Sequence, residues 1–275
     1  MTSCQTHTPA RWQSFEVVVP PPFEPLLTQY LWPFVRESRD ARLLKRFFFI
    51  RYSEGGYHLR LRFLPSRRAT ARWSEDELGL LVSRYATDTQ NSLNGCTLES
   101  RIYDRTTLYF GETMLSVYAE LLNEQSSYLA LRLLCAGQPG PVTLLAKLGA
   151  ILLHVLRRMF DNPGELCEFC GHARKFASES MQRLGLTSPE WNEAVRNKLR
   201  TFLDRSARRS DPSIDCDRNV ARLCSLLRRL RTYYPSGQMV AVHAVHLLFN
   251  KLGFSLMDEY CLFGVLSGVA AKAAS

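Results

Sequence analysis

Hydrophobic and polar residues alternate along the second half of residues 47–63, and this alternation predicts a β-strand. The first half is a run of apolar residues, and a Glu-Gly-Gly segment separates the two halves, so the pattern predicts a β-hairpin. Because successive side chains of a strand point to opposite faces, His58, Arg60 and Arg62 share one face of the second arm. An imidazole and two guanidiniums are costly to bury without partners. We therefore expect this face to be either a solvated edge or the floor of a site that receives a polar or anionic group.

The hydrophobic pattern of the remaining chain predicts strands early and helices late. The predicted strands outside the hairpin are 15–19 and 97–103, and the predicted helices are 25–35, 74–86, 111–123, 143–160, 165–184, 188–204, 217–233, 238–252 and 255–272. This order is typical of an α+β protein, with an N-terminal antiparallel or mixed sheet that contains the hairpin, followed by a mostly helical C-terminal half. We expect a single domain over residues 1–275, with a sheet-rich part at 15–110 and a helical part at 111–275.

Composition and charge narrow the classes of protein and of partner. A chain of 275 residues with 46% hydrophobic residues can bury a large core. Its formal net charge of +9 suits an acidic partner, which leaves open an acidic peptide, a nucleic acid or the anionic background of the cell. No apolar run is long enough to span a membrane, and the N-terminus lacks the pattern of a signal peptide. The eight cysteines are too sparse for a secreted disulfide scaffold, so we expect a cytoplasmic protein with no membrane partner.

Three blocks of sequence occur in the order found in one known family. They are Phe-Phe-Phe-Ile-Arg-Tyr-Ser-Glu-Gly-Gly-Tyr-His-Leu-Arg-Leu-Arg-Phe at 47–63, Ile-Tyr-Asp-Arg-Thr-Thr-Leu-Tyr-Phe-Gly at 102–111 and His-Leu-Leu-Phe-Asn-Lys-Leu-Gly at 246–253. On these blocks the chain resembles the lantibiotic dehydratase C-terminal family, also called the thiopeptide-type bacteriocin biosynthesis domain, over residues 15–260. The resemblance implies action on a ribosomally made precursor peptide.

The family contains two chemistries, and this sequence departs from the pattern of one of them. Eliminating members remove glutamate from esterified Ser or Thr to leave dehydroalanine or dehydrobutyrine. Pyridine synthases instead join two dehydroalanines by a formal aza-Diels–Alder cycloaddition, with loss of water and of the leader peptide. Where eliminating members carry a Glu and an Arg, this sequence has Thr106 and Tyr109, so an obvious bidentate site for a departing glutamate is missing. The resemblance therefore favours a pyridine synthase that forms a pyridine-containing macrocycle.

Two alternatives to the pyridine synthase remain open. One is a stand-alone glutamate-elimination domain that works with a separate glutamylating partner. The other is a non-catalytic subunit that binds the leader peptide. The favoured interpretation implies a precursor peptide with an acidic leader and a dehydrated, azole-bearing core as partner, together with other biosynthetic enzymes of the pathway.

The resemblance assigns candidate roles to residues of all three blocks. Candidate catalytic residues are His246, Tyr103, Tyr109, Arg60 and Arg62, and candidate substrate-binding residues are His58, Arg51, Asn250 and Arg105. Preorganised cationic donors suit polarisation of an amide toward its iminol tautomer, and a histidine or a tyrosine suits proton transfer. His243, one turn before His246, is a reserve for acid–base work. Each group also has a structural interpretation: a basic strand face packed under acidic side chains, a histidine satisfied within an apolar helix, and tyrosines that pack near strand ends.

Arginines are frequent in the C-terminal half, and Arg228 and Arg229 are the candidate docking residues for an acidic leader peptide. A solvated helix face is the structural alternative. Nothing in the sequence resembles an RNA-recognition motif, so we expect no nucleic-acid partner.

Cys167, Cys170 and His172 offer three soft ligands in a short run, which is half of a typical zinc site. Cys216 or Cys224 would have to supply a fourth ligand, and neither belongs to a second pair with metal spacing. The family chemistry needs no metal, so we expect no cofactor, and zinc at this run stays an open alternative.

Overall fold

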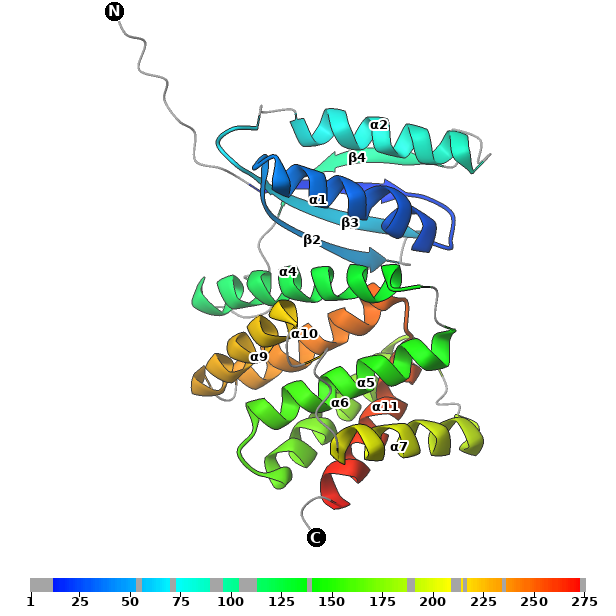
Figure 1. The fold of residues 1–275 in the computed structure, drawn as a ribbon, viewed down its shortest axis with the longest axis vertical. Helices are drawn as coiled ribbons and strands as arrows, with labels where there is room; N and C mark the ends of the chain where they lie inside the picture. Colours follow the sequence, from blue (N-terminus) through cyan, green and yellow to red (C-terminus); the bar gives the residue numbers. More distant parts are fainter. Residues whose placement is uncertain are drawn as a thin grey trace, which may run out of the picture. The chain divides into compact units, whose positions relative to one another are not determined.

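The chain folds into a strand-containing N-terminal unit and a helical C-terminal unit (Figure 1). The computed structural model describes residues 12–52, 56–69, 73–89, 96–103, 113–137, 140–186, 191–208, 214, 217–233 and 236–272. Unit 1 comprises residues 1–104, unit 2 comprises residues 105–275, and each has a hydrophobic core of its own. The α+β class is confirmed, and the division lies close to the predicted change from sheet to helices. That the two parts form one domain stays a prediction.

Unit 1 is a four-stranded sheet with helices on one face (Figure 1). Its elements are β1 Gln13–Val18, η1 Leu26–Leu31, α1 Trp32–Asp40, β2 Leu44–Tyr52, β3 His58–Pro65, α2 Trp73–Asp88 and β4 Thr97–Arg101. The strand order is β2-β3-β1-β4 with every neighbouring pair antiparallel, so β2 and β3 form the predicted hairpin. The helix predicted at 25–35 is a π-helical stretch, η1, that runs directly into α1.

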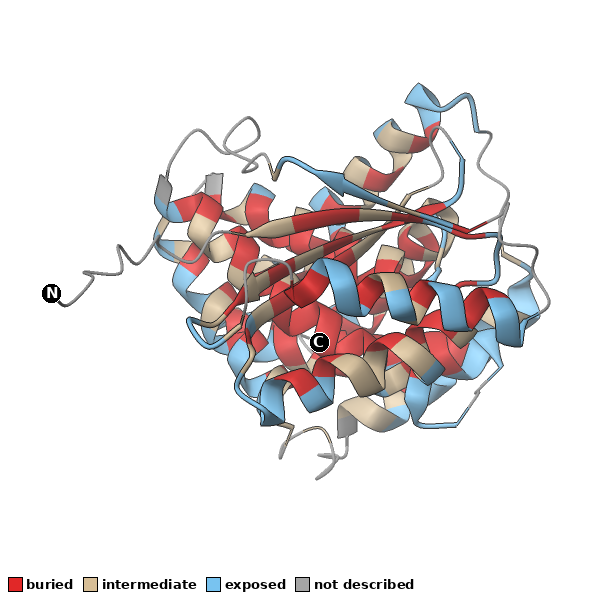
Figure 2. Cartoon of the chain, turned by 90° about the horizontal axis from the view of Figure 1, so that it is seen from above, coloured by how far each residue is buried: buried red, intermediate tan, exposed pale blue. Residues whose placement is uncertain are grey.

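One face of this sheet carries the core of unit 1. Phe49, Leu61 and Phe63 are almost completely buried there, and each such side chain stabilises the fold by about 1.5–3 kcal/mol. Phe34 of α1 packs edge-on against Phe63 and stacks on Trp73 of α2 at 5.6 Å, so both helices cover this face. Buried and partly buried positions alternate along β3 from Leu59 onward, as the sequence pattern predicts. Figure 2 shows such bands of buried and intermediate residues along the strands of the sheet.

Unit 2 is built from helices. They are α4 Thr113–Cys135, α5 Pro141–Met159, α6 Pro163–Arg183, α7 Glu193–Arg208, α9 Arg218–Leu230, the short 3-10 helix η3 Arg231–Tyr233, α10 Ser236–Leu252 and α11 Leu256–Lys272. The closest packing joins α6 to α11 and α10 to α4. Among the helices that the structure describes, none is long and apolar enough to cross a membrane.

The helix predicted at 111–123 is too short, because α4 continues to Cys135. Four polar residues at 124–127 interrupt the hydrophobic pattern, yet all four are buried. The Ser127 hydroxyl donates a hydrogen bond to the carbonyl oxygen of Asn123 at 2.7 Å, one turn earlier. A hydroxyl that is satisfied by its own helix can be buried, so a pattern of hydropathy alone misses this half of the helix.

Gly149 lets α5 approach its neighbours closely. A Cβ at this position would lie 3.1 Å from a methyl group of Leu203 on α7 and 3.1 Å from one of Leu262 on α11. We expect Gly149→Leu to lower the free energy of unfolding by about 1–3 kcal/mol, because the added side chain overpacks this contact. Urea unfolding followed by circular dichroism measures the change.

Gly171→Leu is the matched control for this prediction. Gly171 is an exposed helical glycine of α6, and a Cβ there would meet no atom within 4 Å. Leucine favours the helix over glycine by about 0.5–1 kcal/mol, so the control should unfold at the same or a higher urea concentration. Equal destabilisation by both substitutions would contradict the close packing at Gly149.

Candidate functional site

Side chains from all four strands meet on the face of the sheet opposite α1 and α2. His58, Arg60 and Arg62 of β3 share this face, as their alternation with leucine and phenylalanine predicts. The pairing register adds residues of β1, β2 and β4. We call this surface the polar sheet face; its polar members are Ser14, Glu16, Arg46, Tyr52, His58, Arg60, Arg62, Thr97, Glu99 and Arg101.

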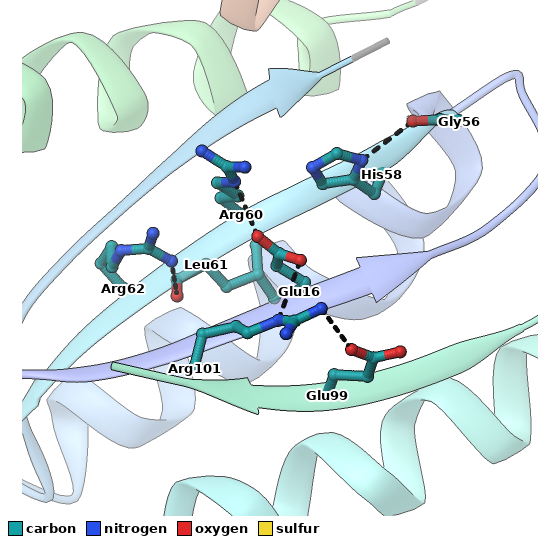
Figure 3. A network of polar contacts seen from close by, with 8 residues as sticks. All are labelled: Glu16, Gly56, His58, Arg60, Leu61, Arg62, Glu99 and Arg101. Atoms are coloured by element: carbon teal, nitrogen blue, oxygen red, sulfur yellow. Dashed lines mark hydrogen bonds and ion pairs between the residues drawn. The ribbon is translucent and has the colours of Figure 1, made fainter. Parts of the chain in front are cut away.

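Glu16 is the acidic centre of the polar sheet face (Figure 3). It lies directly opposite Arg60 in the register of β1 and β3, and its carboxylate accepts hydrogen bonds from Arg60 Nε at 2.8 Å and from Arg101 Nε at 3.1 Å. Arg101 also pairs with Glu99 at 2.6 Å. Burial alone raises the pKa of Glu16, but the charges of Arg60 and Arg101 outweigh it and hold the pKa below its ordinary value. The acidic partner of Arg60 therefore comes from a neighbouring strand.

Arg60, Tyr52 and His58 form a stack along the edge of the hairpin. The Arg60 guanidinium lies 3.8 Å from the centre of the Tyr52 ring, and that ring is nearly parallel to the His58 imidazole with centroids 5.3 Å apart. His58 Nδ1 lies 2.9 Å from the carbonyl oxygen of Gly56. A carbonyl can only accept, so Nδ1 carries the hydrogen and Nε2 is the acceptor of the neutral ring. His58 Nε2 is buried and has no hydrogen-bond partner among the described residues.

Arg62 differs from Arg60 in its partners. Its Nη1 donates to the backbone carbonyl of Leu61 at 3.1 Å, and its guanidinium lies over the ring of Tyr103 at 5.5 Å. Burial, followed by the like charge of Arg60, lowers the pKa of Arg62 from its ordinary value. Within the described part of the chain no carboxylate pairs with it. Arg62 is thus a half-buried cation available to a polar group from outside the protein.

Aromatic side chains surround Arg62. Trp12 packs against Phe48 at 5.1 Å and against Tyr103 at 5.7 Å between ring centroids. The resulting surface joins a cation to flat apolar rings. Such a surface can hold an amide group by its oxygen while the rings contact apolar parts of a peptide.

Arg51 does not lie on the polar sheet face. It pairs with Leu59 in the hairpin register, so its side chain points to the opposite face of the sheet. There it forms an ion pair with Glu24 at 2.7 Å and lies over the ring of Phe23. Burial lowers the pKa of Arg51, and Glu24 opposes that shift. Arg51 therefore lies apart from Arg60 and Arg62 and ties β2 to the segment before η1, and its role in substrate binding stays a prediction.

Two candidate residues, Arg105 and Tyr109, lie outside the described residues, as does Thr106. Their proposed roles stay predictions.

His246 of α10 is paired with a buried carboxylate that the sequence analysis missed. Its Nδ1 lies 2.7 Å from Glu259 Oε2 of α11, and the edge of Phe176 from α6 packs against the imidazole at 5.2 Å. Glu259 is completely buried, and its Oε1 has no hydrogen-bond partner in the described structure. Burial raises the pKa of Glu259, and the contact with His246 opposes this. The side chain of His246 is 24% exposed, which leaves its Nε2 as the nitrogen available for proton transfer.

His243 is a weaker candidate for acid–base work. Burial, then the charges of His246 and Lys251, lowers the pKa of His243 to about 4, so the ring is neutral at neutral pH. Its ring centroid lies 6.2 Å from that of His246.

Lys251 belongs to the third sequence block, at 246–253. It is completely buried, donates a hydrogen bond to Asn123 Oδ1 of α4 at 2.8 Å, and has its pKa lowered by burial. Asn250, the preceding residue of α10, is half-buried. Arg228 and Arg229 are exposed near the end of α9.

The cysteines of the described chain are free, and most are buried. Burial raises the pKa of Cys170 to about 12, and it also raises the pKa of Cys96, Cys224 and Cys261. Cys167 Sγ contacts the carbonyl of Ser267, and His172 Nδ1 lies 2.8 Å from Gln238 Nε2. No cluster of three or more possible metal ligands occurs in the residues whose structure is described, and Cys216 lies outside them.

Comparison with known proteins gives one family. The family model described as lantibiotic biosynthesis dehydratase C-term matches residues 12–270. No curated protein matches the chain.

Solved structures with a similar fold include two proteins of about this length and one much longer enzyme. The tRNA-dependent lantibiotic dehydratase MibB from Microbispora sp. 107891 is 20% identical with a TM-score of 0.61, and the match covers 99% of this chain but only 29% of MibB. TsrL is 16% identical with a TM-score of 0.63, covering 96% of this chain and 95% of TsrL. TbtD, a pyridine synthase from thiomuracin biosynthesis, is 15% identical with a TM-score of 0.62, covering 96% of this chain and 99% of TbtD. At these identities the likeness shows a shared fold.

The lowered pKa of His243 predicts a pH dependence of stability. Between pH 6.5, the ordinary pKa, and about 4, the unfolded chain binds a proton at this position that the folded protein does not. Stability therefore falls as the pH falls through this interval, by on the order of 3 kcal/mol for this group alone. His243→Gln should remove most of this loss, measured as the change in urea midpoint between pH 7 and pH 4.5. His172→Gln, at an exposed histidine of α6, should keep the wild-type slope, and the same slope in both variants would contradict the assignment.

Proposed function

This chain is a member of the lantibiotic dehydratase C-terminal family, and we propose that it is a pyridine synthase acting on a ribosomally made precursor peptide. The proposed substrate carries an acidic leader and a dehydrated, azole-bearing core. Two dehydroalanines are joined by a formal aza-Diels–Alder cycloaddition, water is lost, and the leader leaves as an amide, which gives a pyridine-containing macrocycle. The proposal needs no cofactor and places the reaction in the cytoplasm, beside the other enzymes of the pathway.

The unequal pairing of two arginines carries this proposal. Glutamate elimination calls for a site that binds the carboxylate of the departing glutamate, and a pair of arginines is suited to bind it. Here Arg60 is already bonded to the internal carboxylate of Glu16, and Thr106 and Tyr109 stand where eliminating members carry a Glu and an Arg. Of Arg60, Arg62 and Arg101, only Arg62 has no carboxylate partner among the described residues. A single cation suits a neutral amide better than a free glutamate.

The proposed work of the polar sheet face is to turn a substrate amide into its iminol tautomer. Arg62 donates a hydrogen bond to the amide oxygen, where negative charge develops, and the hydrogen of the amide nitrogen passes to that oxygen through water. His58, four residues before Arg62 on β3, holds a different part of the peptide backbone. The tautomer supplies the C=N bond that the cycloaddition needs. Tyr103, which lies over the Arg62 guanidinium, is the proposed donor to the hydroxyl that leaves as water. If the protein holds the two alkenes in the reactive orientation, the loss of conformational freedom is incurred on binding and no longer adds to the barrier of the cycloaddition.

His246 is the proposed acid–base group for the later steps. With Nδ1 held by Glu259, its Nε2 can take a proton from the ring and return one to the departing amide. Glu259 touches no substrate in this proposal and acts as a positioning residue, because it selects the tautomer of His246.

Glutamate elimination by a stand-alone domain is the second candidate function. Asp104 and Arg105 of the elimination block are retained in this sequence, and MibB, a lantibiotic dehydratase, has a similar fold. A non-catalytic leader-binding subunit is the third.

Mass spectrometry of the products separates the three candidates. A dehydrated, azole-bearing precursor peptide should be converted to a pyridine macrocycle plus a leader amide. Release of glutamate from a glutamylated peptide would instead identify elimination, and binding without either product would identify a silent subunit.

Arg62→Gln tests the proposed role of the polar sheet face in this assay. We expect kcat to fall by about 100-fold, because the substitution removes a donor at the developing oxyanion. Arg36→Gln is the control, since Arg36 is an exposed arginine on α1, the opposite side of the sheet. Unchanged turnover of Arg62→Gln, with circular dichroism showing the native fold, would remove the polar sheet face from catalysis.

Glu259→Leu tests the positioning of His246. We expect kcat to fall by about 10- to 100-fold with an unchanged KM, because the imidazole loses its fixed tautomer. Glu259→Gln, which keeps an acceptor oxygen, should restore part of the rate. Nitrogen-15 NMR of the imidazole should show the hydrogen moving from Nδ1 to Nε2 in the leucine variant. A slower enzyme in which the tautomer is unchanged would mean that Glu259 acts only through stability.

A further inference from the structure

A pocket of about 580 Å³ opens in unit 2 beside α9, at the C-terminal end of α5. Its size falls within the range of about 300–1,000 Å³ that is usual for ligand sites. Arg157 and Arg158 of α5 and Arg228 of α9 line it, together with Asp161, Phe160 and small side chains of α9. Neither catalytic proposal above uses this pocket.

The pocket carries an excess of positive charge. All three arginines are exposed, and Asp161 is the one acidic residue among the described residues that line it. Asp161 is itself engaged by Arg231, whose Nη1 lies 2.9 Å from Oδ2. Its remaining contact with Arg228 is 3.7 Å long and exposed, which makes it a weak ion pair. A carboxylate that enters the pocket therefore has only this weak ion pair to displace at Arg228.

A comparison with Arg231 shows which arginines serve the fold. Arg231 donates to the carbonyl oxygen of Met159 at 2.8 Å and also pairs with Asp161 and with Glu165, so it joins η3 to the α5–α6 connection. Arg228 has no comparable set of acceptors within the described structure. Its position at the mouth of the pocket is explained better by an external partner than by the fold.

The other lining residues favour an acidic peptide over a nucleic acid. The uncharged lining residues of α9 are the exposed Ala221 and Ser225 and the buried Cys224, whose thiol is kept neutral because burial raises its pKa. Phe160 is the aromatic residue of the lining, and its ring already contacts Phe169 at 5.5 Å and the Arg231 guanidinium at 5.6 Å. The pocket thus offers no stacking platform for bases, whereas short carboxylate side chains fit a lining of arginines and small uncharged side chains.

We propose that this pocket binds an acidic segment of the precursor peptide, its leader, through Arg158 and Arg228. The identity of the partner rests on the proposed function, while the preference for carboxylates rests on the pocket. Of the two docking residues predicted from the sequence, Arg228 lines the pocket, and Arg229, its neighbour in sequence, does not. The proposal therefore keeps Arg228 and replaces Arg229 with Arg158.

Fluorescence anisotropy with two labelled peptides tests the site. The first is a 12-residue peptide that contains six glutamates, and the second has glutamine at those six positions. We expect the acidic peptide to bind the wild-type protein more weakly as the salt concentration rises, and the glutamine peptide to bind at least about tenfold more weakly. The double variant Arg158→Gln, Arg228→Gln should lose about tenfold in affinity for the acidic peptide. Arg222→Gln, at an exposed arginine of the same helix that does not line the pocket, should bind as the wild-type protein does.

Three results would overturn the inference: equal binding of both peptides, equal loss in the double variant and in Arg222→Gln, or stronger binding of a single-stranded RNA of equal charge. Turnover of the full precursor separates this inference from the proposed function. A raised KM with unchanged kcat in the double variant supports the docking pocket. If the double variant forms the pyridine product with an unchanged KM, the docking pocket is wrong and the proposed function is not affected. If the peptide binds through the pocket but the protein forms no pyridine product, the proposed function is wrong and the docking pocket is not affected.

Discussion

The carboxylate of Glu16 is the interaction on which the polar sheet face depends. Without it, Arg60 and Arg62 of β3 and Arg101 of β4 would place three like charges on the two sides of β1, and their repulsion would destabilise the sheet. Glu16 holds Arg60 in place, Arg60 lies on the ring of Tyr52, and that ring sets the plane of His58. Because the strand order places β1 between β3 and β4, the carboxylate of Glu16 lies between the arginines of these two strands and offsets their charges. Because Arg60 and Arg101 are paired with carboxylates and Arg62 is not, Arg62 is the one of these three arginines left for a substrate.

Local periodicity is sufficient to predict the hairpin and most helices, but not the partners of their side chains. The alternation of β3 shows that His58, Arg60 and Arg62 share a face, since that is a property of one strand. Glu16 lies 44 residues before Arg60, and their contact follows from which strands pair, which alternation does not encode. Arg51 illustrates the same limit, because its face is decided by its register with Leu59.

The helical unit shows where hydropathy misleads. The bounds of α10 and α11 lie within two residues of those predicted, because their apolar spacing is regular. In the sequence, Asp258 and Glu259 are both acidic residues in the first turn of a helix, where a negative charge is favourable. Asp258 does accept hydrogen bonds from Ser255 there, but Glu259 is buried and pairs with His246. Only the packing of α11 against its neighbours separates the two roles.

The buried thiols have a consequence for an enzyme that handles dehydroalanine. That residue is an electron-poor alkene, and thiolates add to such alkenes readily, whereas protonated thiols add slowly. Burial raises the pKa of Cys96, Cys170, Cys224 and Cys261, so these sulfurs stay protonated at neutral pH. The same packing that fills the cores with small apolar side chains thereby protects these four thiols from alkylation by the proposed substrate.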